Sequence, residues 1–390
     1  MRLLRTLPTK RLVLILAAAA IVAIGGASIA VAAGGGGSTP PPKDLPNAIH
    51  DALTGTPPTG VTARISFTNK LFPSGALVGA NTSALMSGAS GRLWANDTGG
   101  RLELQSDAGD VQITWNDSKV TVYDASSNTA YTFDLPAQQP STTTDTHQPP
   151  SLDQITTFLA DLAKHWNVSG ADPSNVGGAE AYTVTVSPSH DGGLLGSAQL
   201  AWDAINGVPL RVAIYAQGAS SPALALEATD ITFGDVADSD VNVPPPAGAK
   251  IVDLSSQTSG KDSGTSTPAV TGLPAVQAAA PFTVTAPDSL VGLTRRDVRL
   301  VGPSDSRSAV VVYGQGLGAI VVVERAKDTS GGGAPSQLDA LPSISLDGAT
   351  AHELATQLGT ILTWDRAGVS YILAGSVPSS AAEAAARDLK

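Results

Sequence analysis

The segment SPSHDGG, residues 187–193, brings together a serine, a histidine and an aspartate, the residue types of a hydrolytic triad. Members of such triads usually come from distant segments, because the fold must bring them to one point. The sequence also lacks a G-x-S-x-G motif, which would set a serine nucleophile on a sharp turn. We therefore expect Ser187, His190 and Asp191 to form a polar turn, and we do not expect an enzyme.

The sequence also shows no motif that is typical of a metal or cofactor site. The five histidines are scattered without an H-E-x-x-H spacing, and the absence of cysteine excludes disulfides and thiolate metal sites. The glycines of GQGLG, residues 314–318, lie between two valine-rich segments, whereas a dinucleotide-binding loop joins a strand to a helix. We expect a hairpin turn at this point, and neither a metal nor another cofactor.

Composition restricts the classes of partner. The chain has 390 residues, a formal net charge of −11, 40 glycines and 27 prolines, which favours a strand-rich protein with many turns. Binding to nucleic acid phosphates requires clustered lysine and arginine, and no such cluster occurs after the first eleven residues. We therefore expect no nucleic acid partner.

Residues 1–33 have the pattern of an N-terminal segment that enters or crosses a membrane. Four cations among the first eleven residues precede an uncharged run, residues 12–33, that is long enough to cross a bilayer as a helix. This segment is either an uncleaved single-pass anchor in the cell membrane or a signal peptide cut after residues 30–32. Both alternatives place the bulk of the chain outside the cytoplasm.

Composition divides the rest of the chain into four parts. GGGGSTPPPKD, residues 34–44, predicts a spacer, and the Ser/Thr/Gly-rich residues 255–272 predict a linker between domains. A larger domain is predicted over residues 45–254. Residues 273–390 predict a smaller α+β domain with a valine-rich hairpin, further strands and a terminal helix.

The larger domain has the pattern of an antiparallel meander, a helix and a second set of strands. In WNDSKVTVYDASSNTAYTF, residues 115–133, period-two alternation places five apolar side chains on one face. A helix is predicted over residues 151–166, where Ser151 and Gln154 form a capping box. Its apolar stripe requires an apolar surface, and we expect it to cover the apolar face of the meander.

The space between sheet and helix is a candidate ligand cavity. Only 4% of the residues are aromatic, and a large curved sheet packs less tightly against one or two helices than two sheets pack together. The gap could admit a lipid-like chain, although the same side chains could simply fill a core. The residues expected to line the cavity are Phe67, Trp94, Leu104, Trp115, Val120, Val122, Tyr131, Phe133, Phe158, Leu162, Val212 and Ile214.

Several segments of residues 45–254 resemble the LolA/LolB-like lipoprotein-carrier superfamily, which includes the RseB/MucB-type regulators. The segments that carry the resemblance are GRLWAND with GRLELQSD, WNDSKVTVYDASSNTAYTFDLP, GGAEAYTVTVSP, AWDAINGVPLRVAIYAQG and ITFGDVADSDVNVPPPAGAKIV. The resemblance implies an α+β fold in which a curved antiparallel half-barrel sheet wraps over helices around a cavity for acyl chains. No functional residue of the family can be assigned to a position in this chain, because the family shares no catalytic motif.

Two features depart from a lipoprotein carrier. An uncleaved anchor would prevent diffusion between membranes, and there is no cysteine to be lipidated. Residues 273–390 look like a small C-terminal domain of membrane-anchored bacterial regulators. Three hypotheses follow: a tethered extracytoplasmic protein that binds a lipid or lipidated ligand for envelope trafficking or sensing; an RseB/MucB-like regulator that binds a membrane signalling partner without carrying lipid; or a structural envelope protein with a filled core.

Overall fold

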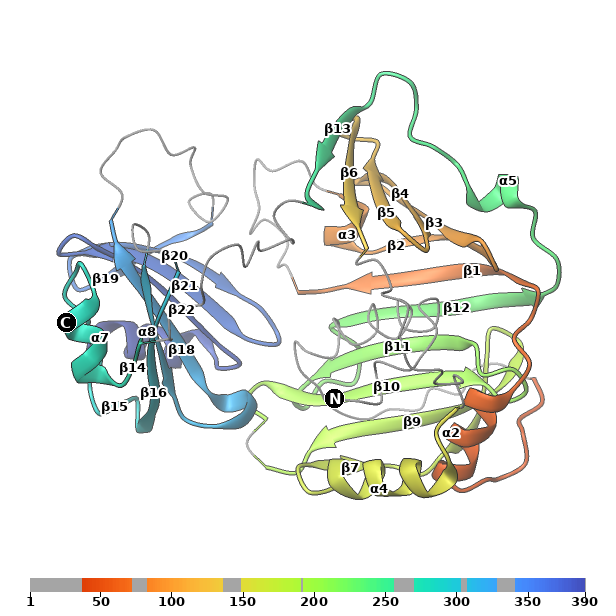
Figure 1. Ribbon diagram of the computed structural model, residues 1–390, viewed down its shortest axis with the longest axis horizontal. Coiled ribbons are helices and arrows are strands. Elements are labelled where there is room, and N and C mark those ends of the chain that lie inside the picture. Colours follow the sequence, from red (N-terminus) through yellow and green to blue (C-terminus); the bar gives the residue numbers. More distant parts are fainter. Residues whose placement is uncertain are drawn as a thin grey trace, which may run out of the picture. The chain divides into compact units, whose positions relative to one another are not determined.

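Most of the alternating segments form strands of two sheets, one in each of two units of the chain (Figure 1). This computed structural model describes residues 37–71, 83–135, 149–190, 192–255, 270–302, 307–327 and 341–389. The predicted anchor, residues 1–33, lies outside these ranges, as does most of the predicted linker 255–272. No helix within the described ranges is long and apolar enough to cross a bilayer.

The larger unit begins with a helix and a six-stranded run. Its elements are α2 (Leu45–Thr54), β1 (Gly60–Asn69), α3 (Ala84–Ser87), β2 (Ala89–Asn96), β3 (Gly99–Ser106), β4 (Gly109–Asn116), β5 (Lys119–Asp124) and β6 (Thr129–Asp134). The second part contains α4 (Leu152–Leu162), β7 (Trp166–Val168), β8 (Asp172–Val176), β9 (Ala179–Pro188), β10 (Leu195–Asp203), β11 (Pro209–Ala216), β12 (Leu224–Phe233), α5 (Asp238–Val241) and β13 (Lys250–Asp253).

These strands form one open sheet in the order β13-β6-β5-β4-β3-β2-β1-β12-β11-β10-β9-β7, with β8 paired to β9. The pairs from β1 to β6 are antiparallel hairpin neighbours, whereas β13 joins β6 in parallel. Figure 1 shows β3 to β6 running across the direction of β1 and β12, so the sheet is strongly curved. The predicted α+β class, with an open, curved and mostly antiparallel sheet and few helices, is confirmed.

Helix α4 begins as predicted but ends earlier and packs elsewhere. The capping box of Ser151 and Gln154 is present, and the helix stops at Leu162, because a turn at residues 163–165 leads into strand β7. Its Leu159 packs against α2 and against Tyr182 and Trp202 of β9 and β10. The prediction that this helix covers the meander is therefore wrong: its apolar stripe packs at the opposite end of the sheet.

The short helix α3 covers the meander instead. Ala84 and Leu85 of α3 belong to one apolar cluster with Ile65 of β1, Leu104 of β3 and Val111 of β4. The sequence did not predict this helix, because four residues are too few to show a helical period. Ser83 caps it by accepting a hydrogen bond from the backbone amide of Leu85.

Part of the predicted spacer is attached to the larger unit. The hydroxyl of Tyr182 donates to the carbonyl of Pro41 at 2.7 Å, and Nδ2 of Asn175 donates to the carbonyl of Ser38 at 2.9 Å. Lys43 forms an ion pair with Asp51 of α2 at 2.5 Å. Residues 38–43 are thus held against α2, β8 and β9 and do not form a free spacer.

The smaller unit is a second antiparallel sheet with two helices. Its elements are β14 (Val270–Thr271), α7 (Leu273–Ala279), β15 (Ser289–Leu290), β16 (Leu293–Val301), β17 (Ser308–Tyr313), the 3-10 turn η2 (Gly316–Gly318), β18 (Ile320–Ala326), β19 (Ser343–Leu346), β20 (Ala349–Ala355), β21 (Thr360–Arg366), β22 (Val369–Gly375) and α8 (Ser379–Asp388). The sheet order is β14-β16-β17-β18-β22-β21-β20-β19, with β15 paired to β16.

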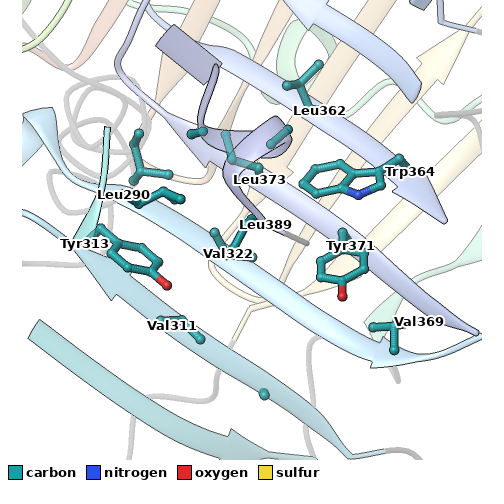
Figure 2. Close-up of a cluster of buried hydrophobic side chains, with 14 of the residues drawn as sticks. Leu290, Val311, Tyr313, Val322, Leu362, Trp364, Val369, Tyr371, Leu373 and Leu389 are labelled. Atoms are coloured by element: carbon teal, nitrogen blue, oxygen red, sulfur yellow. The ribbon is translucent and has the colours of Figure 1, made fainter. Parts of the chain in front are cut away.

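The core of the smaller unit lies between this sheet and its helices. Figure 2 shows Trp364 and Tyr371 side by side, and their rings stack with centroids 5.0 Å apart. Leu389, which follows α8, is fully buried in the same cluster. The glycines of GQGLG lie in the turn between the antiparallel strands β17 and β18, which confirms the predicted hairpin.

Candidate functional site

Register places most of the predicted cavity residues on one face of the larger sheet, because directly paired residues point to the same side. On this apolar face Trp115 is paired with Val120, and Val120 with Phe133. The predicted residues that share the face are Phe67, Leu104, Trp115, Val120, Val122, Tyr131, Phe133, Val212 and Ile214. The structure therefore brings together nine of the twelve candidates.

The remaining three candidates lie elsewhere. Trp94 is paired with Thr62 and Arg101, one residue out of phase with the apolar face, so its side chain lies on the opposite, polar face. Phe158 and Leu162 belong to α4 at the far end of the sheet, and Phe158 is 50% exposed. The prediction that these three residues line the cavity with the meander is wrong.

Burial differs along the apolar face. Leu104 and Ile214 are buried, whereas Val120, Tyr131 and Phe133 on the two strands near β13 are only half-buried. Val122 packs at the margin of the cluster that α3 covers. The described residues thus leave an apolar strip, Trp115, Val120, Tyr131 and Phe133, next to the cluster covered by α3.

A hollow of about 670 Å³ lies on the polar face over β1, β2 and β3. We call it the arginine hollow, and its charged and aromatic lining consists of Arg64, Arg92, Trp94, Arg101 and Glu103. A second hollow, of about 480 Å³, lies between β4, β5 and the segment around α5. Of the twelve candidates, Trp94 lines the first hollow and Trp115 the second; neither hollow is bordered by the other ten.

One arginine of the hollow is fixed in place. The guanidinium of Arg101 lies 4.3 Å from the centroid of the Trp94 ring, which is a cation–π contact. Its Nη2 donates to Oε1 of Glu103 at 2.6 Å, and its Nη1 donates to the carbonyl of Asp240 at 2.9 Å. The backbone that follows β12 therefore crosses the polar face and helps to orient Arg101.

The other two arginines are less constrained. Arg64 and Arg92 are directly opposite each other on β1 and β2, and both are exposed. Nε of Arg64 lies 3.8 Å from Oδ2 of Asp230, whereas the side chain of Arg92 has no ion-pair or hydrogen-bond partner among the described residues. Each arginine is also directly opposite a carboxylate on its other neighbour, Asp230 for Arg64 and Glu103 for Arg92, which offsets part of the repulsion between the two like charges.

The arginine hollow was not predicted from the sequence. Arg64 and Arg101 each occupy a position out of phase with the apolar residues of their own strands, which is a signal that the sequence contains, whereas Arg92 is in phase with the apolar Trp94. That signal shows only that the side chains leave the core. Their convergence depends on the register of three strands, which the alternation does not determine.

Ser187, which was predicted to lie in a polar turn, instead lies in β9, where it is paired with Asn167 of β7. Nδ1 of His190 lies 2.8 Å from Oγ of the adjacent Ser189, and Asp191 lies outside the described residues. Among the residues that the structure describes, no group of three or more His, Asp or Glu side chains is placed to hold a metal ion.

The larger unit is thus built on a curved antiparallel sheet with one apolar and one charged face. No family model and no curated protein matches the chain. A structure of MucB in complex with MucA(peri) is 14% identical, with 87% of this chain and 95% of that chain covered and a TM-score of 0.40. The Pseudomonas aeruginosa MucA/MucB complex is 13% identical, with 87% and 96% covered and a TM-score of 0.41.

A putative outer membrane lipoprotein-sorting protein domain from Vibrio parahaemolyticus is 10% identical, with 47% of this chain and 89% of that chain covered and a TM-score of 0.16. At such identities and TM-scores the likenesses carry no statement about ligand or activity, and the resemblance of residues 273–390 to a regulator domain stays a prediction.

Proposed function

We propose that this chain is a membrane-tethered extracytoplasmic binding protein whose larger unit holds the acyl chain of a lipid or lipidated ligand on its apolar face, for envelope trafficking or sensing. The proposal includes the anchor in residues 1–33 and a binding role in place of catalysis. The observation that carries it is the half-buried strip of Trp115, Val120, Tyr131 and Phe133.

The physical reason is that an apolar sheet face needs a covering layer. The described helices α2, α3 and α4 pack with other parts of the sheet, and the strip lies outside their clusters. An acyl chain that covers the strip gains about 0.8 kcal/mol for each buried methylene. Burial of several methylenes therefore makes the binding free energy favourable without any polar contact.

The test is photo-crosslinking of the full-length chain in nanodiscs with a diazirine analogue of palmitic acid. Adducts mapped by mass spectrometry are expected on peptides of β4 to β6. Val122→Asp places a charge beside the strip and should strongly reduce labelling there. Thr121→Asp is the matched control, because the neighbouring residue points to the polar face.

Both variants must first melt like the wild type, since a charge in a folded sheet can also cause unfolding. Labelling confined to residues 12–33, or equal labelling of both variants, would refute the proposal. The regulatory alternative gives a different result when the chain is affinity-purified from its native membranes: a stable membrane protein is recovered with it, and Val122→Asp retains that protein although no acyl adduct forms.

A further inference from the structure

The arginine hollow lies on the face opposite to the apolar strip, so acyl binding does not use it. Three arginines and one glutamate line it, and Asp230 at its margin pairs with Arg64. Arg64 and Arg92 lie directly opposite each other, with Asp230 opposite Arg64 on β12 and Glu103 opposite Arg92 on β3. Two exposed guanidinium groups on directly paired residues can attract an anion that bridges them.

The hollow is partly preorganised for such an anion. Arg101 is only 17% exposed and is held by Glu103, Trp94 and the carbonyl of Asp240. Its Nε is buried and has no hydrogen-bond partner within the described ranges. Arg64 and Arg92 extend beside it with exposed guanidinium groups, which can each bind a carboxylate through two parallel hydrogen bonds.

The shape of the hollow favours an extended chain over a small ion. Ser90, Arg92 and Trp94 alternate along β2, and Arg101, Glu103 and Gln105 alternate along β3. Contact points therefore repeat every second residue, about 6.6 Å apart, which is also the repeat of side chains on one side of an extended peptide. The volume of about 670 Å³ exceeds what one inorganic ion requires.

We propose that the arginine hollow binds an acidic, extended peptide segment of a partner protein, with carboxylates on Arg64 and Arg92. The site is independent of acyl binding, because it lies on the other face of the sheet. Its polar lining, including Ser90, Gln105 and Thr229, offers hydrogen bonds to the backbone of such a peptide.

The test uses the full-length chain in nanodiscs and a fluorescein-labelled peptide of alternating Glu and Ser, followed by fluorescence anisotropy. The wild type should bind at low ionic strength and bind more weakly at about 0.15 M salt, where surface charges are screened beyond about 8 Å. Arg64→Gln with Arg92→Gln should weaken binding about tenfold, as expected for the loss of two partly exposed ion pairs.

A matched control is available in the smaller unit. Arg299 is ion-paired with Asp297, as Arg64 is with Asp230, and Arg325 is exposed on a strand, as Arg92 is. Arg299→Gln with Arg325→Gln removes the same charge and should change the affinity less than about twofold. Equal thermal melting of both double variants excludes unfolding as the cause.

Four results would overturn the proposal. These are no binding of the acidic peptide at low salt, equal weakening in the control double variant, equal affinity for a peptide of alternating Gln and Ser, and displacement of the peptide by an equal concentration of inorganic phosphate. The last result would assign the hollow to a small oxyanion. Because acyl labelling reports on the other face, failure here leaves the photo-crosslinking result unchanged.

Discussion

The indole of Trp115 lies against the backbone of Gly100 on the neighbouring strand, so closely that a Cβ on this glycine would be 2.1 Å from Cζ2 of the ring. The two residues are directly paired across β3 and β4. Trp115 therefore covers a glycine of its own sheet with part of its ring. This contact explains why one aromatic residue of the apolar strip is held in place without a helix above it.

Gly100→Ala should displace the Trp115 ring and destabilise the larger unit by about 1–3 kcal/mol, the usual cost of overpacking. Urea unfolding followed by tryptophan fluorescence measures this change. Gly234→Ala is the control, because a Cβ at Gly234 meets no atom within 4 Å. If the two variants unfold at the same urea concentration, the Trp115 ring does not lie on Gly100 in solution.

The position of α4 leads to a second prediction. Ile155 is 4% exposed and Phe158 is 50% exposed on the same helix. Ile155→Ala should lower the free energy of unfolding by about 2–4 kcal/mol, whereas Phe158→Ala should change it by less than about 0.5 kcal/mol. Thermal unfolding by circular dichroism distinguishes them. The reverse order would show that α4 presents Phe158, and not Ile155, to the protein.

A buried carboxyl in the smaller unit leads to a third prediction. The backbone amide of Thr285 donates to Oε2 of Glu324 at 2.8 Å, while Oε1 has no partner among the described residues. Burial raises the pKa of the Glu324 carboxyl to about 7. Burial, and then the charge of Glu324, also raises the pKa of the nearby Tyr313 hydroxyl.

Because this pKa is higher in the folded chain than in the unfolded chain, the folded state binds more protons between about pH 4.5 and pH 7. The contribution of Glu324 to stability therefore falls as pH rises through this window, by an amount on the order of 3 kcal/mol. Glu324→Gln keeps an acceptor for Thr285 and removes the ionisation.

The free energy of unfolding of Glu324→Gln should exceed that of the wild type more at pH 8 than at pH 4.5. Chemical denaturation at both pH values measures the difference, and Glu383→Gln on α8 serves as a control for loss of a partly exposed carboxylate. A pH-independent difference would show that folding does not raise the pKa of Glu324.

Local sequence patterns predicted where helices and strands form better than they predicted which of these elements pack together. The capping box located the start of α4, and period-two alternation indicated the strands of the meander. The apolar stripe of α4 indicated only that some apolar surface must cover it. The choice of Tyr182 and Trp202 as that surface depends on long-range packing, which no local period encodes.

The candidate site shows the same limit at the level of single residues. In GRLWAND, Leu93 and Trp94 are adjacent and both apolar, so the segment alone does not show which of them faces the core. Pairing resolves the question: Leu93 lies opposite Ala63, and Trp94 lies opposite Thr62. An aromatic side chain was expected in the core because of its bulk, but this one forms a platform for Arg101.

The pairing of β1 with β12 determines when the larger sheet can be completed. Val61 lies opposite Phe233, and the final strand β13 joins β6 only at residues 250–253. A chain that emerges from its N-terminus first makes β1 to β6 early but leaves one edge of β1 open until β12 follows. Such distant pairings fold slowly, and an open edge can recruit a wrong strand. While the chain folds, the edge of β1 therefore stays open to pairing with a wrong strand until β12 has been made.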